Sequence, residues 1–325
     1  MEKPPQPLVC VLIINYNGRK LLDRLLESFP KTDYSNYRLI VIDNGSTDGS
    51  MAGFKKTHPS VELFPLDKNI GFSGGNNVGI GHALKKYRPD YVLLLNNDLE
   101  VIEPGWLSEM VRCAESEPRV GIVGCKLLYP DNTIQHAGEL FWPDRLRGKG
   151  EGAGNYSAVE EVQAVSFAAV LISRRLIEGV GALDEVFSPY GYEDLDLCMR
   201  ARKAGYKVLY AGTASLHHLE GGSMKLDIRT DSLLARNAMI FYSRYAPLHQ
   251  RILMAARIYA RLVFRRSDRR RALGKGNFSA HLSPGDMLSL PARVLAVSSA
   301  IVSGVRLAGS PKVPAIGTGQ SGSTV

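Results

Sequence analysis

The chain has 325 residues, of which 45% are hydrophobic and 22% charged, so it can bury a sizeable core and is neither broadly disordered nor a polytopic membrane protein. Its four cysteines form no C-x-x-C pair and are too few for a disulfide scaffold, and its first residues lack the order of a signal peptide, which favours a cytoplasmic, reducing compartment. The net charge of +8 arises in one stretch, because residues 244–275 hold ten Lys or Arg and only one acid.

Four runs in the first hundred residues predict strands: the buried runs 8–15 (LVCVLIIN) and 37–43 (YRLIVID), a short strand at 61–65, and the apolar run 91–95 (YVLLL). Residues 19–29 lie between the first two runs and carry leucines at helical spacing. Strands that alternate with helices predict an α/β fold, with a mostly parallel, Rossmann-like sheet and helices on both of its faces.

Three of these predicted strands end in polar residues, namely Asn15-Tyr16-Asn17, Asp43-Asn44 and Asn97-Asp98. In open α/β sheets, ligands bind outside the carboxyl ends of the strands. Because parallel strands bring these ends to one edge, we expect the three clusters to line a binding site there.

The pattern loosens after about residue 120. Residues 120–128 and 162–173 are strand-like, whereas residues 129–159 are rich in Gly, Asp and Pro and predict loops with an irregular hairpin. Residues 193–204 (EDLDLCMRARKA) predict a helix that ends before Gly205, and residues 207–210 predict one more short strand.

The Asp98 carboxylate follows a predicted strand and is a candidate metal ligand. A divalent cation bound there could stabilise the negative charge that builds on a leaving group such as a diphosphate, a task that basic groups can also perform. Mg²⁺ takes one or two carboxylates from a protein and completes its shell with phosphates and water. The alternative is a structural role, because an Asp after a strand is commonly a turn residue or helix cap.

The adjacent acids Glu193 and Asp194 stand at the start of a predicted helix. One of them could take the proton of an attacking hydroxyl as general base, or both could merely complement the helix dipole. The pair His217-His218 could complete a metal site or simply be solvated. The glycine-rich stretch 69–77 (NIGFSGGNN) precedes a possible helix and could let backbone amides approach a phosphate or sugar, although such loops are common.

The order and spacing of these motifs resemble glycosyltransferase family 2, a large family with the GT-A fold. The resemblance covers roughly residues 8–223, about two thirds of the chain. It runs through VLIINYNG (11–18), VIDNGSTDGS (41–50), NIGFSGGNNVGI (69–80), LLLNNDLEV (93–101), VGALDEVFSPYGYEDLDLCMRARKAGYKVLY (180–210) and HLEGGS (218–223). The GFSGGNN and EDLD forms look most like the branch that contains bacterial rhamnosyltransferases of cell-wall and O-antigen assembly.

The resemblance implies donor-binding roles. Tyr16 and Asp43 match the nucleobase site, with Ile14 beside them and Asp43 accepting from the pyrimidine ring. The other implied donor-binding residues are Asn17, Asn69, Gly71, Asn76, Asn97 near the ribose, and Asp98.

Catalytic and metal-binding roles are also implied. Asp194 matches the general base, with Glu193 as its neighbour in the acceptor site. Asp98, at the third position of the family's D-x-D motif, and His218 match the metal ligands, His218 better than His217, and the implied cofactor is Mg²⁺ or Mn²⁺. The first two D-x-D positions are amides here, so a bound cation would have fewer anionic ligands.

The implied activity is inverting transfer of a sugar from a nucleotide diphosphate by single displacement, with dTDP-rhamnose the first candidate donor and a UDP-sugar the second. The implied acceptor is a cell-envelope or polyprenyl-linked saccharide. The alternative is a protein of the same fold that binds a nucleotide sugar or carbohydrate without catalysis; the presence of Asp98, Asp194 and His218 favours the transferase. A nucleotidyltransferase usually carries a Gly-rich, basic signature at its first strand end, which NYNG lacks.

The basic stretch predicts an amphipathic helix. On a helical wheel one arc holds the apolar residues Ile252, Leu253, Ala256, Tyr259, Ala260, Val263 and Phe264, and the opposite arc holds Arg251, Arg257, Arg261 and Arg265. Such a helix suits an anionic membrane surface; packing on the catalytic domain with a solvated basic face is the alternative. Residues 294–305 are apolar but too short to span a bilayer, which takes about 20 residues. No nucleic-acid recognition motif accompanies the charge, so nucleic acid is not an expected partner.

These features predict three parts. Residues 1–225 form a GT-A catalytic domain, with a donor-binding half at about 8–120 and an acceptor-binding half at about 121–225. Residues 226–308 form a helical, basic appendage that associates with the membrane, and the Gly-, Ser- and Thr-rich residues 309–325 form a disordered tail. We expect a cytoplasmic protein, peripheral on the inner face of the cell membrane.

Overall fold

A computed structural model describes residues 6–142, 144–219, 228–263 and 290–309 of the chain. They belong to two compact units, one within Met1–Gly222 and the other within Ser223–Pro311, and each unit is described by itself. The predicted disordered tail lies outside the described residues apart from residue 309. Among the described helices, none is both long and apolar enough to cross a membrane.

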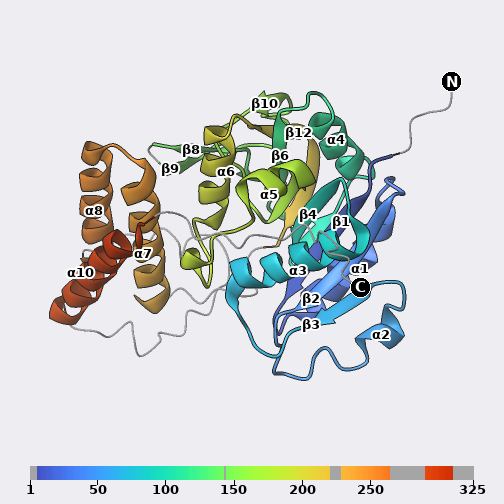
Figure 1. Ribbon diagram of the computed structural model, residues 1–325, viewed down its shortest axis with the longest axis horizontal. Helices are drawn as coiled ribbons and strands as arrows, with labels where there is room; N and C mark the ends of the chain where they lie inside the picture. Colours follow the sequence, from blue (N-terminus) through green and yellow to red (C-terminus); the bar gives the residue numbers. More distant parts are fainter. Residues whose placement is uncertain (1–5, 143, 220–227, 264–289, 310–325) are drawn as a thin grey trace, which may run out of the picture. The chain divides into compact units, whose positions relative to one another are not determined.

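The first unit contains a ten-stranded mixed sheet and a separate two-stranded one. Its strands are β1 (Val9–Asn15), β2 (Tyr37–Asp43), β3 (Glu62–Pro65), β4 (Tyr91–Asn96), β5 (Leu99–Val101), β6 (Val120–Leu128), β7 (Ile134–His136), β8 (Glu139–Phe141), β9 (Asp144–Leu146), β10 (Val159–Glu161), β11 (Ala169–Ser173) and β12 (Lys207–His218). The large sheet has the order β10-β12-β6-β11-β4-β1-β2-β3, while β5 pairs with β12 and β7 with β6 (Figure 1).

The strand directions divide this sheet into two parts. β1 is parallel to both β2 and β4, and β2 is parallel to β3. β11 is antiparallel to β4 and to β6, and β6 and β12 again form a parallel pair. The strand direction therefore changes at β11. On one side of β11 lie the parallel strands β4, β1, β2 and β3, and on the other side lies the parallel pair β6 and β12.

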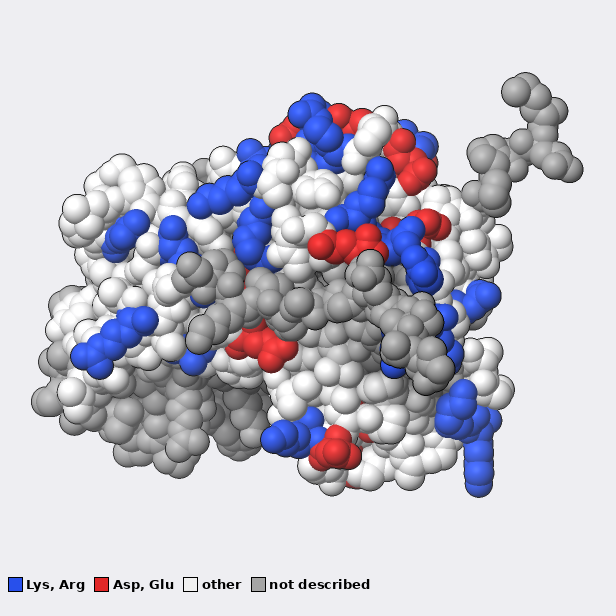
Figure 2. Space-filling view, viewed as in Figure 1, with Lys and Arg blue, Asp and Glu red and all other residues white. Residues whose placement is uncertain are grey.

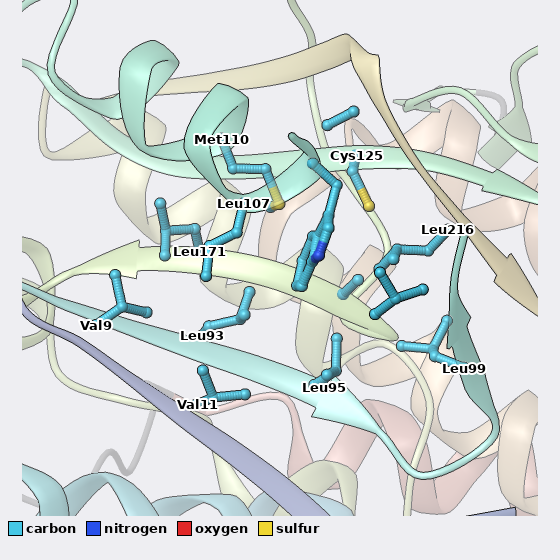
Figure 3. Packing of buried hydrophobic residues seen from close by; sticks show 14 of the residues in the cluster. Val9, Val11, Leu93, Leu95, Leu99, Leu107, Met110, Cys125, Leu171 and Leu216 are labelled. Carbon is cyan, nitrogen blue, oxygen red and sulfur yellow. The ribbon is translucent and has the colours of Figure 1, made fainter. Parts of the chain in front are cut away.

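The helices of the first unit are α1 (Arg19–Ser28), α2 (Phe54–Thr57), α3 (Gly71–Tyr87), α4 (Trp106–Ala114), α5 (Arg174–Val180) and α6 (Glu193–Lys203), with 3₁₀ turns η1 (Phe29–Lys31) and η2 (Glu185–Phe187). α1 and α4 supply buried side chains to the same hydrophobic cluster. Figure 3 shows Leu107 and Met110 of α4 over the strand residues Leu93 and Leu171. Each such fully buried side chain contributes about 1.5–3 kcal/mol by leaving water, so this cluster stabilises the sheet that holds the site.

α3 packs on β1 and β2 through residues without side chains. A Cβ on Gly75 would lie 2.5 Å from Ile14 Cδ1, and one on Gly79 would lie 3.0 Å from Ile42 Cγ1. The sequence predicts a glycine-rich turn before a helix, but the helix begins at Gly71 and takes in the rest of that motif. The physical reason is this close approach, which stabilises a helix despite the low helix propensity of glycine.

Two strands differ in length from the sequence-based expectation. The strand predicted at residues 207–210 continues to His218, because β12 pairs with β6 along most of its length and then with β5. The strand predicted at residues 162–173 is restricted to Ala169–Ser173, the residues that pair with β4 and β6. In both cases the partner strands, rather than local residue preference, set the ends.

The second unit contains α7 (Ile228–Tyr245), α8 (Leu248–Val263) and α10 (Leu290–Leu307), which pack against one another. The predicted helical region is therefore present. The three helices line an open groove of about 590 Å³. Among residues 248–260 of α8, whose burial is described, only Ile258 is buried, whereas Ile252 and Leu253 are 60% and 47% exposed. The predicted apolar arc of this helix is thus not covered along its described part; Phe264 and Arg265 lie outside the described residues.

Candidate active site

The carboxyl ends of β1, β2 and β4 meet at one edge of the sheet. In the parallel registers Asn15 pairs with Asp43 and Ile14 pairs with Asn96. The Asn44 amide donates to the Asn15 carbonyl at 2.8 Å, which continues this alignment past the strand ends. The register therefore brings the three strand-end clusters together.

The Asn97 side chain is held by Asn15, the last residue of β1. Its Nδ2 donates to Asn15 Oδ1 at 2.7 Å, and both residues are buried. Gly18 makes room for this pair, since a Cβ there would lie 2.3 Å from Asn97 Nδ2. With Asn15 in this orientation, an aspartate at position 97 would offer no donor to Asn15 Oδ1. Asn15 is not among the predicted site residues, although it stands in one of the predicted strand-end clusters.

The loops after β1 and β2 form one hydrogen-bonded rim. The Asn17 amide donates to Ser46 Oγ at 3.0 Å, and Asn17 Oδ1 accepts from the Thr47 amide at 2.8 Å. Asp43 is buried and accepts from the Ser46 amide at 3.1 Å, whereas Tyr16 is 41% exposed. The rim thus combines a fixed carboxylate with an accessible aromatic ring.

The start of α3 is tied to β2 on one side and to the loop before α6 on the other. Asn69 Oδ1 accepts from the Gly71 amide at 2.9 Å and from Asn44 Nδ2 at 3.2 Å. Gly71 has φ +82°, and a Cβ there would lie 3.0 Å from Pro189 Cα. The Phe72 amide donates to the Pro189 carbonyl at 2.6 Å. This contact places the predicted donor loop beside the segment that leads into the acids of α6.

Asn76 and Asn77 lie side by side in α3 but differ in their contacts. Asn76 Nδ2 donates to the Phe72 carbonyl, and its buried Oδ1 has no hydrogen-bond partner among the described residues. Asn77 donates to the Leu183 carbonyl and accepts from the Leu183 amide. The Asn77 side chain is therefore fixed by the Leu183 backbone, whereas Asn76 has one acceptor without a partner among the described residues.

Asp98 and His218 are brought together by the pairing of β5 with β12. His218 lies opposite Leu99, and the Leu219 amide donates to the Asp98 carbonyl at 2.9 Å. As a result, His218 Nε2 lies 3.2 Å from Asp98 Oδ1. The other ring nitrogen, Nδ1, lies 2.5 Å from Gln135 Oε1 on β7. Gln135 was missed by the sequence analysis, because nothing in the loop-like stretch 129–159 marks it as buried.

His217, the alternative candidate, has other surroundings. It pairs with Glu100 in the ladder, and its Nε2 lies 2.9 Å from Asn132 Oδ1. Because side chains alternate along a strand, His217 and His218 lie on opposite faces of β12. The structure thus brings His218, and not His217, to Asp98.

The donor atoms of Asp98 and His218 fit a divalent cation. In the described part of the chain, no three His, Cys, Asp or Glu side chains gather in a way that could hold a metal. A carboxylate oxygen and an imidazole nitrogen 3.2 Å apart nevertheless supply two ligands, the number that Mg²⁺ commonly takes when phosphates and water complete its shell. The pair is therefore compatible with a cation shared with a bound diphosphate.

The acids at the start of α6 lie in three different environments. Glu193 is buried, and its Oε2 has no hydrogen-bond partner among the described residues. Burial, and secondarily the charge of Asp194, raises the pKa of Glu193 to about 8. Asp196 is fully buried and accepts from Arg200 Nε at 2.8 Å. Asp194 is partly exposed and accepts from the Leu195 amide at 2.8 Å. Only Asp194 thus combines partial exposure with a position at the helix N-terminus, which favours a carboxylate.

A family model described as glycosyl transferase family 2 matches residues 10–178, slightly more than half of the chain. The chain belongs to glycosyltransferase family 2. The predicted resemblance to this family is confirmed.

Three relatives are similar in sequence to this family 2 chain. It is 35% identical over 231 residues to the uncharacterised protein y4gI of Sinorhizobium fredii, a match that covers 67% of this chain and 25% of that protein. It is 30% identical over 254 residues to the O-antigen biosynthesis protein RfbC of Myxococcus xanthus, covering 74% and 19%. It is 27% identical over 235 residues to the N-acetylglucosaminyl-diphospho-decaprenol L-rhamnosyltransferase of Mycobacterium tuberculosis, covering 64% and 75%. The matches thus span only a minor part of the first two relatives.

Solved structures share the fold of this family 2 chain. The mannosyltransferase PcManGT of Pyrobaculum calidifontis, in complex with GDP-Man and Mn²⁺, matches with a TM-score of 0.54 at 17% identity over 93% of this chain and 85% of that chain. TarS of S. aureus, in complex with UDP-GlcNAc, matches with a TM-score of 0.55 at 15% identity over 92% and 82%. The predicted GT-A fold is confirmed.

Proposed function

We propose that the chain is an inverting glycosyltransferase that moves a sugar from a nucleotide diphosphate to a cell-envelope or polyprenyl-linked saccharide by single displacement. The observation that carries the proposal is the pairing of Asp98 with His218 at the sheet edge that also holds Asp43. The proposed donor is dTDP-rhamnose, with a UDP-sugar as the second choice, because one relative is named as an L-rhamnosyltransferase and one structural neighbour holds UDP-GlcNAc.

The proposed donor site runs across the ends of β1, β2 and β4. Asp43 would accept hydrogen bonds from the pyrimidine, the exposed Tyr16 ring would stack on it, and Ile14 would supply apolar contact beside them. Asn97, fixed by its bond to Asn15, would lie near the ribose. The remaining proposed donor contacts come from Asn17, Asn69, Gly71 and Asn76.

The leaving group would meet Asp98 and His218. A bound Mg²⁺ or Mn²⁺ would neutralise charge on the diphosphate. Two structural neighbours were crystallised with Mn²⁺, namely PcManGT and GalNAc-T7, the latter with a TM-score of 0.55 at 15% identity over 74% of this chain and 51% of that chain. In this chain Asp98 and His218 would bind such a cation, and the loop that carries Asn97 would hold Asp98 in place.

Asp194 is the proposed general base, with Glu193 beside it in the acceptor site. Its carboxylate is partly exposed at the start of α6, where the helix dipole favours the ionised form. Glu193 is a poor base at neutral pH because its raised pKa keeps it protonated, and Asp196 is engaged by Arg200. Asp194 would take the proton of the acceptor hydroxyl as that oxygen attacks the sugar.

Metal-dependent donor binding is the direct test. In thermal-shift measurements, dTDP-rhamnose or a UDP-sugar should raise the melting temperature more with Mn²⁺ than with EDTA, because a ligand at one hundred times its Kd stabilises the native state by about 2.7 kcal/mol. EDTA should also abolish transfer, and Mn²⁺ or Mg²⁺ should restore it. Asp98→Asn should lose the metal-dependent part of the shift.

A GDP-sugar controls for binding of the diphosphate alone. Full transfer in EDTA would show that basic side chains stabilise the leaving group and that Asp98 and His218 do not act through a cation. Donor binding without any hydrolysis or transfer would instead favour a nucleotide-sugar-binding protein.

We assign residues 1–225 to the catalytic domain, with donor and acceptor halves at about 8–120 and 121–225, and residues 226–308 to a membrane-associating appendage on the cytoplasmic face of the membrane. α8 and α10 contain five arginines and no acid. Figure 2 shows arginines among uncharged side chains on these helices. Exposed apolar residues, with Leu248 at 70% and Ile252 at 60%, accompany this charge. Both features suit an anionic bilayer surface.

Removing the exposed apolar side chains should weaken membrane binding without affecting the fold. The double variant Ile252→Ser with Leu253→Ser should bind anionic liposomes at least about tenfold more weakly, since burial of each such side chain contributes about 1.5–3 kcal/mol. Sedimentation with anionic and zwitterionic vesicles at low and high salt measures this. Val159→Ser is the matched control, because Val159 is a similarly exposed residue of the first unit. Binding that depends on neither salt nor lipid charge would contradict the electrostatic part of the proposal.

A further inference from the structure

We propose that Gln135 is a positioning residue of the metal site: by accepting a hydrogen bond from His218, it selects the imidazole tautomer that can bind a cation. The inference rests on the proposed role of Asp98 and His218 as metal ligands. Gln135 itself touches neither the donor nor the cation in this scheme.

The sheet places Gln135 and His218 on the same face. Leu128 of β6 pairs with His217 on one side and with Ile134 on the other. Residues that pair across a sheet share a face, and the next residue along each strand lies on the opposite face. His218, the next residue of β12, therefore lies on the face opposite to His217, and Gln135 is the extra residue of β7 at a register shift between the pairs Leu128–Ile134 and Leu127–His136. The distance of 2.5 Å between Gln135 Oε1 and His218 Nδ1 shows that the two side chains meet on one face of the sheet.

The hydrogen bond determines where the imidazole proton lies. Gln135 Oε1 is 2.5 Å from His218 Nδ1, and an amide oxygen can only accept, so Nδ1 carries the hydrogen. In the neutral ring Nε2 then bears a lone pair, which faces Asp98 Oδ1 at 3.2 Å. Two acceptors at this distance repel each other unless a positive group lies between them. The arrangement therefore suits a cation bound by both side chains.

If the side-chain amide of Gln135 were turned by about 180°, His218 could not bind the cation. Gln135 Nε2 would then donate to His218 Nδ1, the ring proton would sit on Nε2, and the imidazole would donate to Asp98 instead of binding a cation. In the observed orientation Gln135 is buried, and its Nε2 has no hydrogen-bond partner within the described part of the chain. The two orientations thus correspond to a metal-binding and a metal-excluding site, which can be distinguished by experiment.

The chain contains a matched pair that lacks the metal-facing carboxylate. His217 Nε2 lies 2.9 Å from Asn132 Oδ1, again a histidine next to a side-chain amide. Asn132 has φ +62°, so glycine replaces it without backbone strain. Asn132→Gly therefore removes an amide from a neighbouring histidine without altering the proposed metal site.

Mn²⁺ affinity, measured by electron paramagnetic resonance with saturating dTDP or UDP, tests the proposal without any turnover. Gln135→Leu should weaken Mn²⁺ binding by about 10–100-fold, the usual effect of removing a partner that orients a metal-bound histidine. Gln135→Glu should restore it, since a carboxylate also accepts from Nδ1–H. Asn132→Gly should bind as the wild type does, and nucleotide affinity in EDTA should be equal in all four proteins.

A second measurement determines the tautomer in the wild-type protein itself. In ¹⁵N spectra of the wild type labelled at histidine, His218, assigned by its loss in His218→Ala, should show a protonated Nδ1 and an unprotonated Nε2. The opposite tautomer, an unchanged affinity in Gln135→Leu, or no restoration by Gln135→Glu would each overturn the proposal. If Asp98→Asn also binds Mn²⁺ as the wild type does, the proposed metal site itself is wrong, which is a separate conclusion.

Discussion

Asp194→Asn is expected to lower the rate of sugar transfer by roughly 10²–10⁴-fold, the usual contribution of general acid–base catalysis, and to leave donor affinity unchanged. Asparagine keeps the shape of the side chain and removes its basicity. A general base acts on the acceptor hydroxyl in the transition state and need not touch the nucleotide, so binding and chemistry should separate. Turnover at saturating donor, together with calorimetry of nucleotide binding, measures the two effects.

Asp196→Asn is the matched control, because it changes an acid of the same helical turn. Asp196 is fully buried against Arg200, which also donates to the Val180 and Ala182 carbonyls. Breaking a buried ion pair costs on the order of 3–5 kcal/mol, so this variant should lose stability and keep its turnover per folded molecule. Transfer at a near wild-type rate by Asp194→Asn would show that Asp194 is not the base and that Glu193 must be tested in its place.

Glu193→Gln is expected to be more stable than the wild type at neutral and alkaline pH. The pKa of Glu193 is raised from 4.5 to about 8, first by burial and then by the charge of Asp194, with a smaller contribution from Asp196. Between these values the native state holds a proton that the unfolded state has released, so the free energy of unfolding falls by about 1.4 kcal/mol per pH unit as pH rises. Glutamine resembles the protonated acid and removes this loss.

Denaturant unfolding of both proteins from pH 4 to pH 9 provides the measurement. The stability difference in favour of Glu193→Gln should be small below pH 4.5, grow through the window and level off above about pH 8. Glu27→Gln, at an exposed position of α1, controls for the substitution itself. Parallel stability curves for Glu193→Gln and the wild type would show that Glu193 is ionised in the native protein, and the distinction drawn between it and Asp194 would fail.

The sequence predicts much of the sheet and the positions of the polar clusters. The continuous apolar run of β1 and the leucine spacing of α1 are local signals, and both elements form close to the expected residues. The polar clusters at the strand ends are also visible in the sequence. Parallel strands that pair in register bring these ends to one edge of the sheet, which is where the structure places them. The assignment of Asp98, Asp194 and His218 to the transfer reaction stays a prediction that the experiments above test.

Residue patterns alone determined that this chain has an α/β fold with a mostly parallel sheet and where its strand-end motifs lie, because burial of apolar strands and turn chemistry depend on neighbours along the chain. The GT-A fold was implied by the resemblance of the motifs to family 2. Only the tertiary structure decided that β12 extends to His218, that α3 begins at Gly71, and that three successive acids of α6 have different surroundings. It also brought Gln135 to His218 across β6. These outcomes depend on contacts between residues far apart in sequence, since partner strands set strand length, close packing stabilises glycine in a helix, and burial decides whether a carboxyl group keeps its proton.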